Sequence, residues 1–175
     1  MDIKQYPVKN FDKGRNGFTP RGVCLHITEG SSTSALNWFN DPKSWASSHY
    51  LVKENGDVLQ LVSEYDMAWG AGLTVKPMWT GLIPNQGIMP TRDGKYENPN
   101  QYLIHVEVAL WGYALFPGYR QWRNTAELVK WICMRYNWPI DELHVPNHNE
   151  IRADKQCPGV WINRSWMQTW IKYLL

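Results

Sequence analysis

Two runs of β-forming residues, 48–53 and 58–62, flank the tetrapeptide Glu54-Asn55-Gly56-Asp57. An Asn-Gly pair readily adopts the positive φ angles of a tight two-residue turn, and such a turn joins neighbouring antiparallel strands. The pattern therefore predicts a β-hairpin. Any fold for this chain must include that antiparallel pair.

Two further segments alternate in the manner of strands. Residues 22–28 place Val23, Leu25 and Ile27 on one face and Cys24, His26 and Thr28 on the other, as in a half-buried or central strand. Residues 102–110 place Leu103, His105, Glu107 and Ala109 on one face. Both strands therefore carry polar side chains among apolar neighbours.

Helical periodicity occurs in three places. Residues 31–34 offer N-cap candidates for a short helix that runs to Phe39 and stops at Asn40-Asp41-Pro42. Asn124, with Glu127 in the capping-box position, predicts a second helix with an apolar stripe of Leu128, Val129, Ile132, Cys133 and Tyr136. A third helix is expected to begin near Asn163. The order strand, helix, hairpin, strand, helix, helix predicts an α/β fold in which helices flank a central mixed β-sheet.

The length of the chain fits one domain. It has 175 residues, and a typical domain holds roughly 100 to 200. We therefore expect a single domain over residues 1–175. Within it, residues 1–20 are expected to form an irregular lead-in and residues 72–100, with four Pro and four Gly, a long loop in which Trp79 lines a cleft.

Charge and composition narrow the choice of partners. The formal net charge of +2 gives no electrostatic case for binding nucleic acid. The amino terminus lacks a basic segment followed by an apolar one, so we expect synthesis in the cytoplasm without a signal peptide. The longest apolar stretch, 106–116, is shorter than the roughly 20 residues of a membrane span, so no membrane insertion is expected. Eleven Trp residues favour a ligand that contains sugar rings or peptide. We expect a monomer.

Three cysteines in a chain without an export signal argue against a disulfide framework. At least one thiol therefore needs another role. His148 and Cys157 lie nine residues apart in a segment that Pro158-Gly159 breaks and that lacks helical periodicity, so both can converge on one ion from a loop. Imidazole and thiolate are ligands that Zn²⁺ prefers. His26 is the best candidate for a third ligand, and three protein ligands leave the fourth tetrahedral position of a catalytic zinc for water.

Each of these residues also has an ordinary structural interpretation. A histidine on a strand is usually structural, a lone cysteine is usually a small buried hydrophobe, and Lys155 would ordinarily be a solvated charge. Glu107 is harder to explain in that way, because a buried carboxylate is costly unless it is paired or functional. The metal hypothesis therefore depends on the combination of residues.

That combination resembles the zinc-dependent N-acetylmuramoyl-L-alanine amidases, also called amidase-2 or peptidoglycan-recognition-protein-like amidases. The most specific part of the resemblance is His26, His148 and the Lys-Gln-Cys-Pro-Gly ending at 155–159. The resemblance implies a single-domain fold of the amidase-2 type. The matching motifs occur in the family's order over residues 20 to 170: the strand with His26, Ser47-Ser48-His49-Tyr50-Leu51-Val52, Asp66-Met67-Ala68-Trp69-Gly70-Ala71-Gly72, Ile104-His105-Val106-Glu107, His148-Asn149-Glu150-Ile151 and Lys155-Gln156-Cys157-Pro158-Gly159.

The resemblance also implies a role for each site residue. His26, His148 and Cys157 would bind one Zn²⁺ ion. Lys155 would help to stabilise the oxyanion that forms on the scissile carbonyl. Glu107 occupies the position of a glutamate in the AmpD-like branch and would act as general base and then as general acid.

The sequence departs from the family pattern at three positions. The phage-lysozyme and recognition-protein branch has a catalytic tyrosine eight residues before the hairpin glycine; that position is Ser48 here, so Tyr50 is not its equivalent. The family's Trp-His-Ala-Gly is Trp69-Gly70-Ala71-Gly72 in this chain. The small residue before the Val-Glu pair is replaced by His105, which shares a strand face with Glu107 and is expected to hydrogen-bond or reposition its carboxylate.

The resemblance implies hydrolysis of the amide between N-acetylmuramic acid and L-alanine, with peptidoglycan or soluble muropeptides as the substrate. Two settings remain open: the cysteine ligand and the long loop favour a phage or prophage endolysin that acts on the cell wall, whereas Glu107 favours a cytosolic recycling amidase. A peptidoglycan-binding module without activity is a third possibility. Against it stands Cys157, which family members that only bind characteristically lack. A closed structural zinc site would need a fourth ligand, for which His144 and His49 are candidates.

Overall fold

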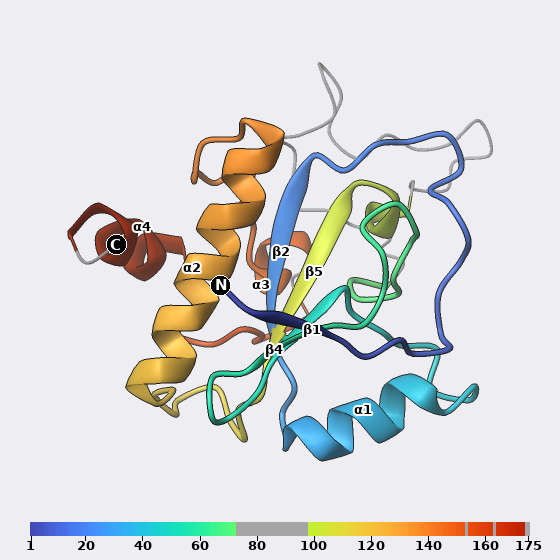
Figure 1. The fold of residues 1–175 in the computed structure, drawn as a ribbon, viewed down its shortest axis with the longest axis horizontal. Helices are drawn as coiled ribbons and strands as arrows, with labels where there is room; N and C mark the ends of the chain where they lie inside the picture. Colours follow the sequence, from blue (N-terminus) through green and yellow to red (C-terminus); the bar gives the residue numbers. More distant parts are fainter. Residues whose placement is uncertain (73–97, 153, 163, 174–175) are drawn as a thin grey trace.

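A five-stranded mixed sheet lies at the centre of the computed structural model, which describes residues 1–72, 98–152, 154–162 and 164–173 (Figure 1). The strand order across the sheet is β1-β4-β3-β5-β2. β3 and β4 pair antiparallel, and the other neighbouring strands pair parallel. The strands are β1 Ile3–Gln5, β2 Gly22–Ile27, β3 Tyr50–Val52, β4 Val58–Gln60 and β5 Leu103–Val108; the helices are α1 Ser32–Asn40, the 3-10 helix η1 Pro99–Gln101, α2 Tyr119–Tyr136, α3 His148–Ile151 and α4 Arg164–Tyr173.

The strands and the hairpin predicted from the sequence are confirmed. β3 and β4 form the antiparallel pair, and Gly56 in the turn between them has a φ of 84°. The α/β fold with a central mixed sheet and flanking helices is confirmed as well. Most of the predicted loop at 72–100, including Trp79, lies outside the described residues, and its end forms η1.

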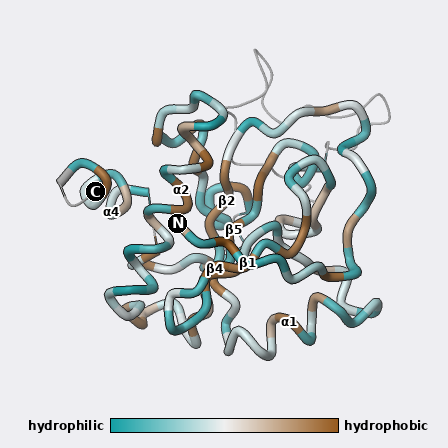
Figure 2. Tube along the Cα trace, in the orientation of Figure 1, coloured by the Kyte–Doolittle hydropathy of each residue, from teal (hydrophilic) through white to brown (hydrophobic). Residues whose placement is uncertain are grey.

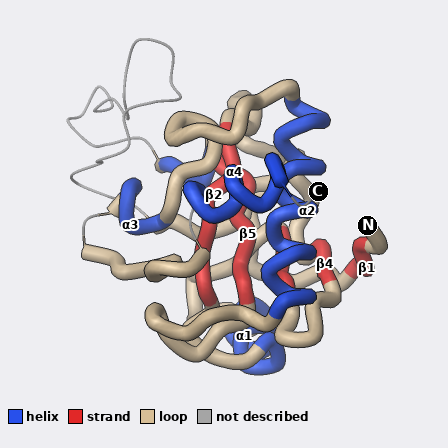
Figure 3. Tube along the Cα trace, turned by 90° about the vertical axis from the view of Figure 1, so that its left-hand side faces the viewer, coloured by secondary structure: helices blue, strands red, loops and turns tan. Residues whose placement is uncertain are grey.

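One face of the sheet packs against α2. The predicted apolar stripe of this helix is buried there, with α4 on its outer side (Figures 1 and 3). Figure 2 shows that hydrophobic residues are concentrated on the central strands. The hydrophobic core between the sheet and α2 includes Val23, Leu25, Ile27, Tyr50, Val52, Ile104, Val106, Val108, Trp122, Leu128, Val129, Ile132, Cys133 and Met167.

The opposite face carries the polar residues of interest. Its apolar parts pack against α1 through Ala35 and Phe39 and against α3 through Ile151. Between these two contacts, β2 and β5 present His26, His105 and Glu107 on the same side, because register pairs His26 with Glu107 and Cys24 with His105. The alternation in the sequence predicted that His105 and Glu107 share a face of their strand; the pairing of β5 with β2, which adds His26 to that side, comes from the structure.

β2 is not a central strand; it is the last strand on its side of the sheet, yet all six of its residues are buried. Residues 144–147 cover its outer edge. The N–H of Val23 donates to His144 O at 2.7 Å, and the N–H of Leu25 donates to Pro146 O at 3.1 Å. This cover satisfies the outer backbone N–H groups of β2, while α2 and α3 pack against its two faces, so this edge strand is buried as a central strand is.

Two of the predicted boundaries are wrong. The lead-in at 1–20 is not wholly irregular, since Ile3–Gln5 pairs with β4. A strand of three residues is too short for an alternating pattern to appear in the sequence. Asn124 does not cap α2, which begins at Tyr119 after Gly118; its side chain instead donates to Gly56 O at 2.7 Å. Glu127 pairs with Arg123 at 2.9 Å rather than completing a capping box.

The segment that carries His148 also differs from the prediction of a loop. His148–Ile151 forms the single turn α3, and the backbone N–H of Asn147 donates to the Glu150 carboxylate at 2.7 Å, which stabilises its start. Four residues are too few for a helical period to appear in the sequence. Among the described residues, no helix has both the length and the apolarity that crossing a membrane requires.

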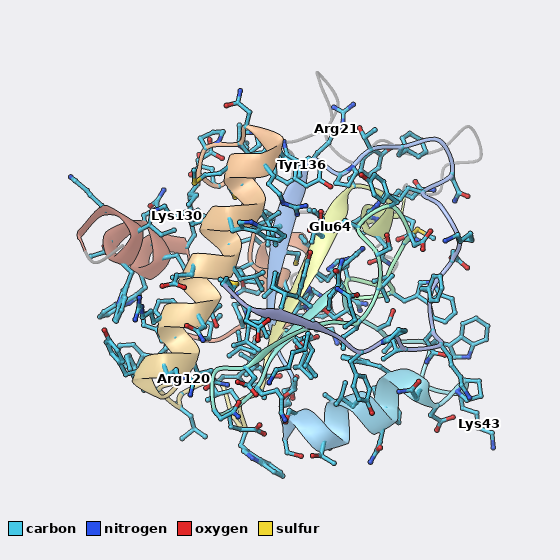
Figure 4. The ribbon with its side chains drawn as sticks, in the orientation of Figure 1. Arg21, Lys43, Glu64, Arg120, Lys130 and Tyr136 are labelled. Atoms are coloured by element: carbon cyan, nitrogen blue, oxygen red, sulfur yellow. The ribbon has the colours of Figure 1, made fainter. Side chains whose placement is uncertain are left out.

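Glu64 joins the hairpin to α2 through a group of polar contacts. It accepts hydrogen bonds from Tyr50 at 2.6 Å and Tyr136 at 2.9 Å and pairs with Arg135 at 2.7 Å. Glu64 and Tyr136 point toward one another in Figure 4. Because a buried hydroxyl that loses a charged acceptor is costly, Glu64→Ala should lower the free energy of unfolding by about 2–3 kcal/mol. Urea denaturation measures this loss. Tyr136→Phe removes one of these bonds and should cost about 1 kcal/mol; equal losses in both variants would contradict this account.

Candidate metal centre

Three side chains from distant parts of the chain meet beside the carboxyl end of β2. His26 Nδ1 lies 3.1 Å from His148 Nδ1 and 3.9 Å from Cys157 Sγ. All three candidate ligand atoms lie within 4.8 Å of one another, and all three residues are buried. The sequence proposed this grouping, and the structure brings its members together.

Local structure fixes each of the three residues. His26 is held by the pairing of β2 with β5, and His148 by the turn α3. Cys157 is tied back to α3, because the N–H of Asn149 donates to Cys157 O at 2.8 Å. The sulfur accepts a hydrogen bond from the N–H of Ile27 at 3.2 Å, which would stabilise a thiolate.

The donor set fits zinc. Two imidazole nitrogens bound to one tetrahedral ion at Zn–N distances of about 2.0–2.1 Å would lie about 3.3 Å apart, close to the 3.1 Å between His26 Nδ1 and His148 Nδ1. Burial, then His148 and Lys155, hold the pKa of His26 well below its usual value, and burial lowers the pKa of His148 to about 4. Both rings are therefore neutral at pH 7, which is the form that binds a metal.

The second nitrogen of His148 has its own partner. His148 Nε2 lies 3.3 Å from the carbonyl oxygen of Ala71. A carbonyl can only accept, so the ring carries its proton on Nε2 and its lone pair on Nδ1. The protein thus directs the lone pair of His148 toward His26 and Cys157.

A second group of possible ligands shares His26. Cys24, His26 and His105 also have ligand atoms within 4.8 Å of one another, and His26 Nε2 lies 3.0 Å from His105 Nδ1. The fourth-ligand candidates His144 and His49 belong to neither group among the described residues. His144 Nδ1 lies 2.6 Å from Asp141, and His49 accepts a hydrogen bond from the N–H of His105 at 2.9 Å.

A cavity of about 450 Å³ opens onto the first group. It is lined by all five residues that the sequence proposed for the site, and the wall formed by α1 contributes Trp38, whose surface is 55% exposed. Cys24 and His105 are absent from the lining. The residues proposed from the sequence that line it are His26, Glu107, Lys155, His148 and Cys157.

Glu107 lies at the floor of this cavity, opposite His26 in the register of the two strands. It is 9% exposed, and its Oε2 is buried without a hydrogen-bond partner among the described residues. Burial, and then the charge of Glu29, raise the pKa of Glu107 to about 8. A buried carboxylate oxygen without a partner, next to a group of metal ligands, has the environment of a proton-transfer group.

Lys155 is exposed at the rim of the cavity, two residues before Cys157. Its charge is close enough to lower the pKa of both His26 and His148. The ammonium group can therefore reach negative charge that develops near the three ligands.

Comparison with known proteins decides the family. Residues 16–160 match the family model described as N-acetylmuramoyl-L-alanine amidase, amidase-2. This chain belongs to that amidase family. N-acetylmuramoyl-L-alanine amidase A of Achromobacter lyticus is 42% identical over 50 residues, which is 28% of this chain and 28% of that protein.

Solved structures of the amidase family share the fold. AmpD superposes with a TM-score of 0.71 at 17% identity, covering 95% of this chain and 93% of that one. An endolysin, the N-acetylmuramoyl-L-alanine amidase LysCS of Clostridium intestinale, superposes with a TM-score of 0.66 at 12% identity, covering 98% and 95%. The fold predicted from the resemblance is confirmed.

The departures from the amidase family's pattern can now be placed. Ser48 is buried, with its Oγ 2.9 Å from the carbonyl oxygen of His105, and Tyr50 faces the other side of the sheet, toward Glu64. Neither lines the cavity. His105 does not hydrogen-bond Glu107 as expected; its ring contacts His26 instead, because parallel strands bring residue 105 diagonally beside residue 26.

Two residues that line the cavity, Glu29 and Trp38, were not predicted from the sequence. Glu29, just beyond β2, has a φ of 53° and is the charge that raises the pKa of Glu107. Trp38 lies on α1 and lines the same cavity. Its place three residues after the buried Ala35 and one before the buried Phe39 was the signal that it lies at the edge of the apolar face.

Proposed function

We propose that this chain is a zinc-dependent amidase that hydrolyses the amide between N-acetylmuramic acid and L-alanine in bacterial peptidoglycan. The observation that carries the proposal is the cavity in which Glu107 lies beside His26, His148 and Cys157. These three residues would hold the ion. Bound there, zinc supplies Lewis-acid polarisation of the scissile carbonyl and lowers the pKa of a coordinated water.

Glu107 would move the proton. Its carboxylate takes a proton from the attacking water as the oxygen adds to the carbonyl carbon, and it later gives that proton to the amine nitrogen of L-alanine as the C–N bond breaks. The unpartnered Oε2 is free to accept it. A pKa raised by burial makes Glu107 a stronger base than an exposed glutamate once it is ionised.

Lys155 would stabilise the charge that develops on the carbonyl oxygen. Lys155→Met should lower kcat about 100-fold, because removing one oxyanion partner costs about 10²–10³ in rate. Zinc content should stay unchanged, since Lys155 is not a ligand. Steady-state kinetics on a muropeptide measure the effect. Lys155→Arg keeps the charge and should retain most of the activity; equal losses in the two variants would argue against an electrostatic role.

We propose that the wall itself is the substrate, as for an endolysin. The endolysin of Clostridium intestinale shares the fold, and so does AmpD, so the choice between cell-wall lysis and the recycling of soluble muropeptides depends on an assay. Purified protein is given intact peptidoglycan and soluble muropeptides, each with and without a zinc chelator. Release of L-alanine amino groups without new reducing sugar ends is the expected result with intact wall.

The same assay contains the outcomes that contradict the proposal. New reducing ends would indicate a glycosidase, and cleavage that survives chelation would exclude the metal mechanism. Cleavage of soluble muropeptides alone would favour the recycling role. Binding to the wall without any release of amino groups would identify a recognition module.

A further inference from the structure

We propose that His105 is a positioning residue that holds His26 in the orientation and tautomer needed for binding zinc through Nδ1, and that Gly70 is glycine because this ring occupies the space beside it. The proposal rests on the proposed zinc site. It concerns a contact behind the cavity wall, since His105 does not line the cavity.

The two nitrogens of His26 have different neighbours. Nδ1 faces His148 Nδ1 at 3.1 Å, and Nε2 faces His105 Nδ1 at 3.0 Å. A neutral imidazole has one proton and one lone pair. If Nδ1 offers its lone pair to the ion, then Nε2 carries the proton and must donate it, and His105 Nδ1 is the acceptor within reach.

The arrangement repeats that of the other histidine ligand. His148 also presents Nδ1 to the site, and its Nε2 lies 3.3 Å from Ala71 O. Metal-bound histidines usually donate their second N–H to a fixed acceptor, which sets the tautomer and the ring orientation. Ala71 fills that position for His148, and His105 fills it for His26.

His105 is itself held firmly. It is fully buried on β5; its backbone N–H donates to His49 Nδ1 at 2.9 Å, and its ring stacks on that of His49 with centroids 5.7 Å apart. His105 Nε2 has no hydrogen-bond partner among the described residues. Within that part of the chain, the contact with His26 is therefore the one hydrogen bond that the His105 ring makes. Burial also keeps water from replacing the acceptor if the ring is removed.

The absence of a side chain at Gly70 leaves space for the His105 ring. A β-carbon at residue 70 would lie 2.4 Å from Cγ, 2.6 Å from Nδ1 and 2.9 Å from Cδ2 of His105, and these are its three nearest atoms. The ring cannot yield easily, because β5 and His49 hold it. The loop glycine and the strand histidine therefore depend on each other, although they lie far apart in the sequence.

The alternative is that His105 is a metal ligand, together with Cys24 and His26. An ion there would use His26 Nε2 and would compete with the hydrogen bond. The cavity favours the positioning role, because it reaches His26 and Gly70 but neither Cys24 nor His105. The number of zinc ions bound per protein molecule distinguishes the positioning role of His105 from a role as metal ligand.

The test compares His105→Leu, which removes the acceptor, with His105→Asn, whose Oδ1 can take the place of Nδ1. Zinc affinity is measured by competition with a chromophoric chelator, and the visible spectrum of the Co²⁺-loaded protein reports the ligand geometry. We expect His105→Leu to weaken zinc binding about 10–100-fold and to alter the Co²⁺ spectrum, whereas His105→Asn stays within about 3-fold of the parent. Cys24→Ala should bind zinc as the parent does.

A second pair of variants tests the space beside Gly70. Gly70→Ala should weaken zinc binding by pushing the ring, although residue 70 is no ligand. In the His105→Asn background, whose side chain is smaller, the same alanine should cost much less, so the two effects are not additive. Circular dichroism of each metal-free variant checks that it folds.

Three results would overturn the proposal. His105→Leu that binds zinc as tightly as the parent excludes the positioning role while leaving the proposed function intact. A second equivalent of zinc that Cys24→Ala removes makes His105 a ligand. A parent protein that binds no zinc overturns the proposed function and this proposal with it.

Discussion

Glu107→Gln should lower kcat about 1,000-fold, within the 10²–10⁴ that a positioned general base contributes, while the protein still binds one zinc ion. Glutamine keeps the size of the side chain but cannot accept the proton of the attacking water. The carboxylate is not among the grouped ligand atoms, so metal content should not change. Turnover of a muropeptide and metal analysis of the same sample make the two measurements.

Glu142→Gln is the matched control for this variant. Glu142 is exposed and does not line the cavity, so the same change of charge there should leave kcat unaffected. Near-normal turnover of Glu107→Gln would exclude Glu107 as the base. Loss of zinc from that variant would instead make Glu107 part of the metal site.

Cys157→Ala should abolish activity by removing the ion. A catalytic zinc has only three protein ligands, and we expect the affinity to fall by more than about 100-fold, the upper end of what losing an outer-shell partner costs. Metal analysis after gel filtration measures the loss directly. Added zinc at high concentration should restore part of the activity if the remaining histidines still orient correctly.

Cys133→Ala provides the control for the thiol. Cys133 is also buried, but it packs in the core between α2 and the sheet and belongs to neither group of possible ligands. It should keep its zinc and its activity and lose only some stability. Full zinc content in Cys157→Ala would remove Cys157 from the proposed ligand set.

Alternation along two strands was enough to predict that His26 shares a face with its strand neighbour Cys24, and His105 with Glu107. It could not show that β2 and β5 pair side by side, because the register of two strands nearly eighty residues apart depends on the whole sheet. The contact between His26 and His105 therefore could not be predicted from the sequence. We expected His105 to contact Glu107 because Glu107 is a polar residue on the same face of the same strand, and the sequence does not show which residues lie on the neighbouring strand.

The other differences between the predicted and observed elements have two causes: some elements are very short, and two expected capping residues make tertiary contacts instead. α3 is one turn, and β1 is three residues at the edge of the sheet, so neither leaves a periodic pattern. Asn124 and Glu127 have the spacing of a capping box, but tertiary contacts to Gly56 and Arg123 use both side chains. Residue chemistry and spacing in the sequence proposed the three ligands. The roles of Glu107 and Lys155 came from the resemblance, and all five assignments remain predictions.

Residues 144–147, which cover the outer edge of β2, connect the proposed metal site to the tendency of the protein to aggregate. Residues 144–147, which occupy the N–H groups of Val23 and Leu25, lead directly into His148. An ion that ties His148 to His26 would therefore also clamp this cover in place. Without the ion, this tie between His148 and β2 would be lost, and an uncovered strand edge would be a template for pairing with another molecule. Scarcity of zinc would then threaten the colloidal stability of the protein as well as its catalysis.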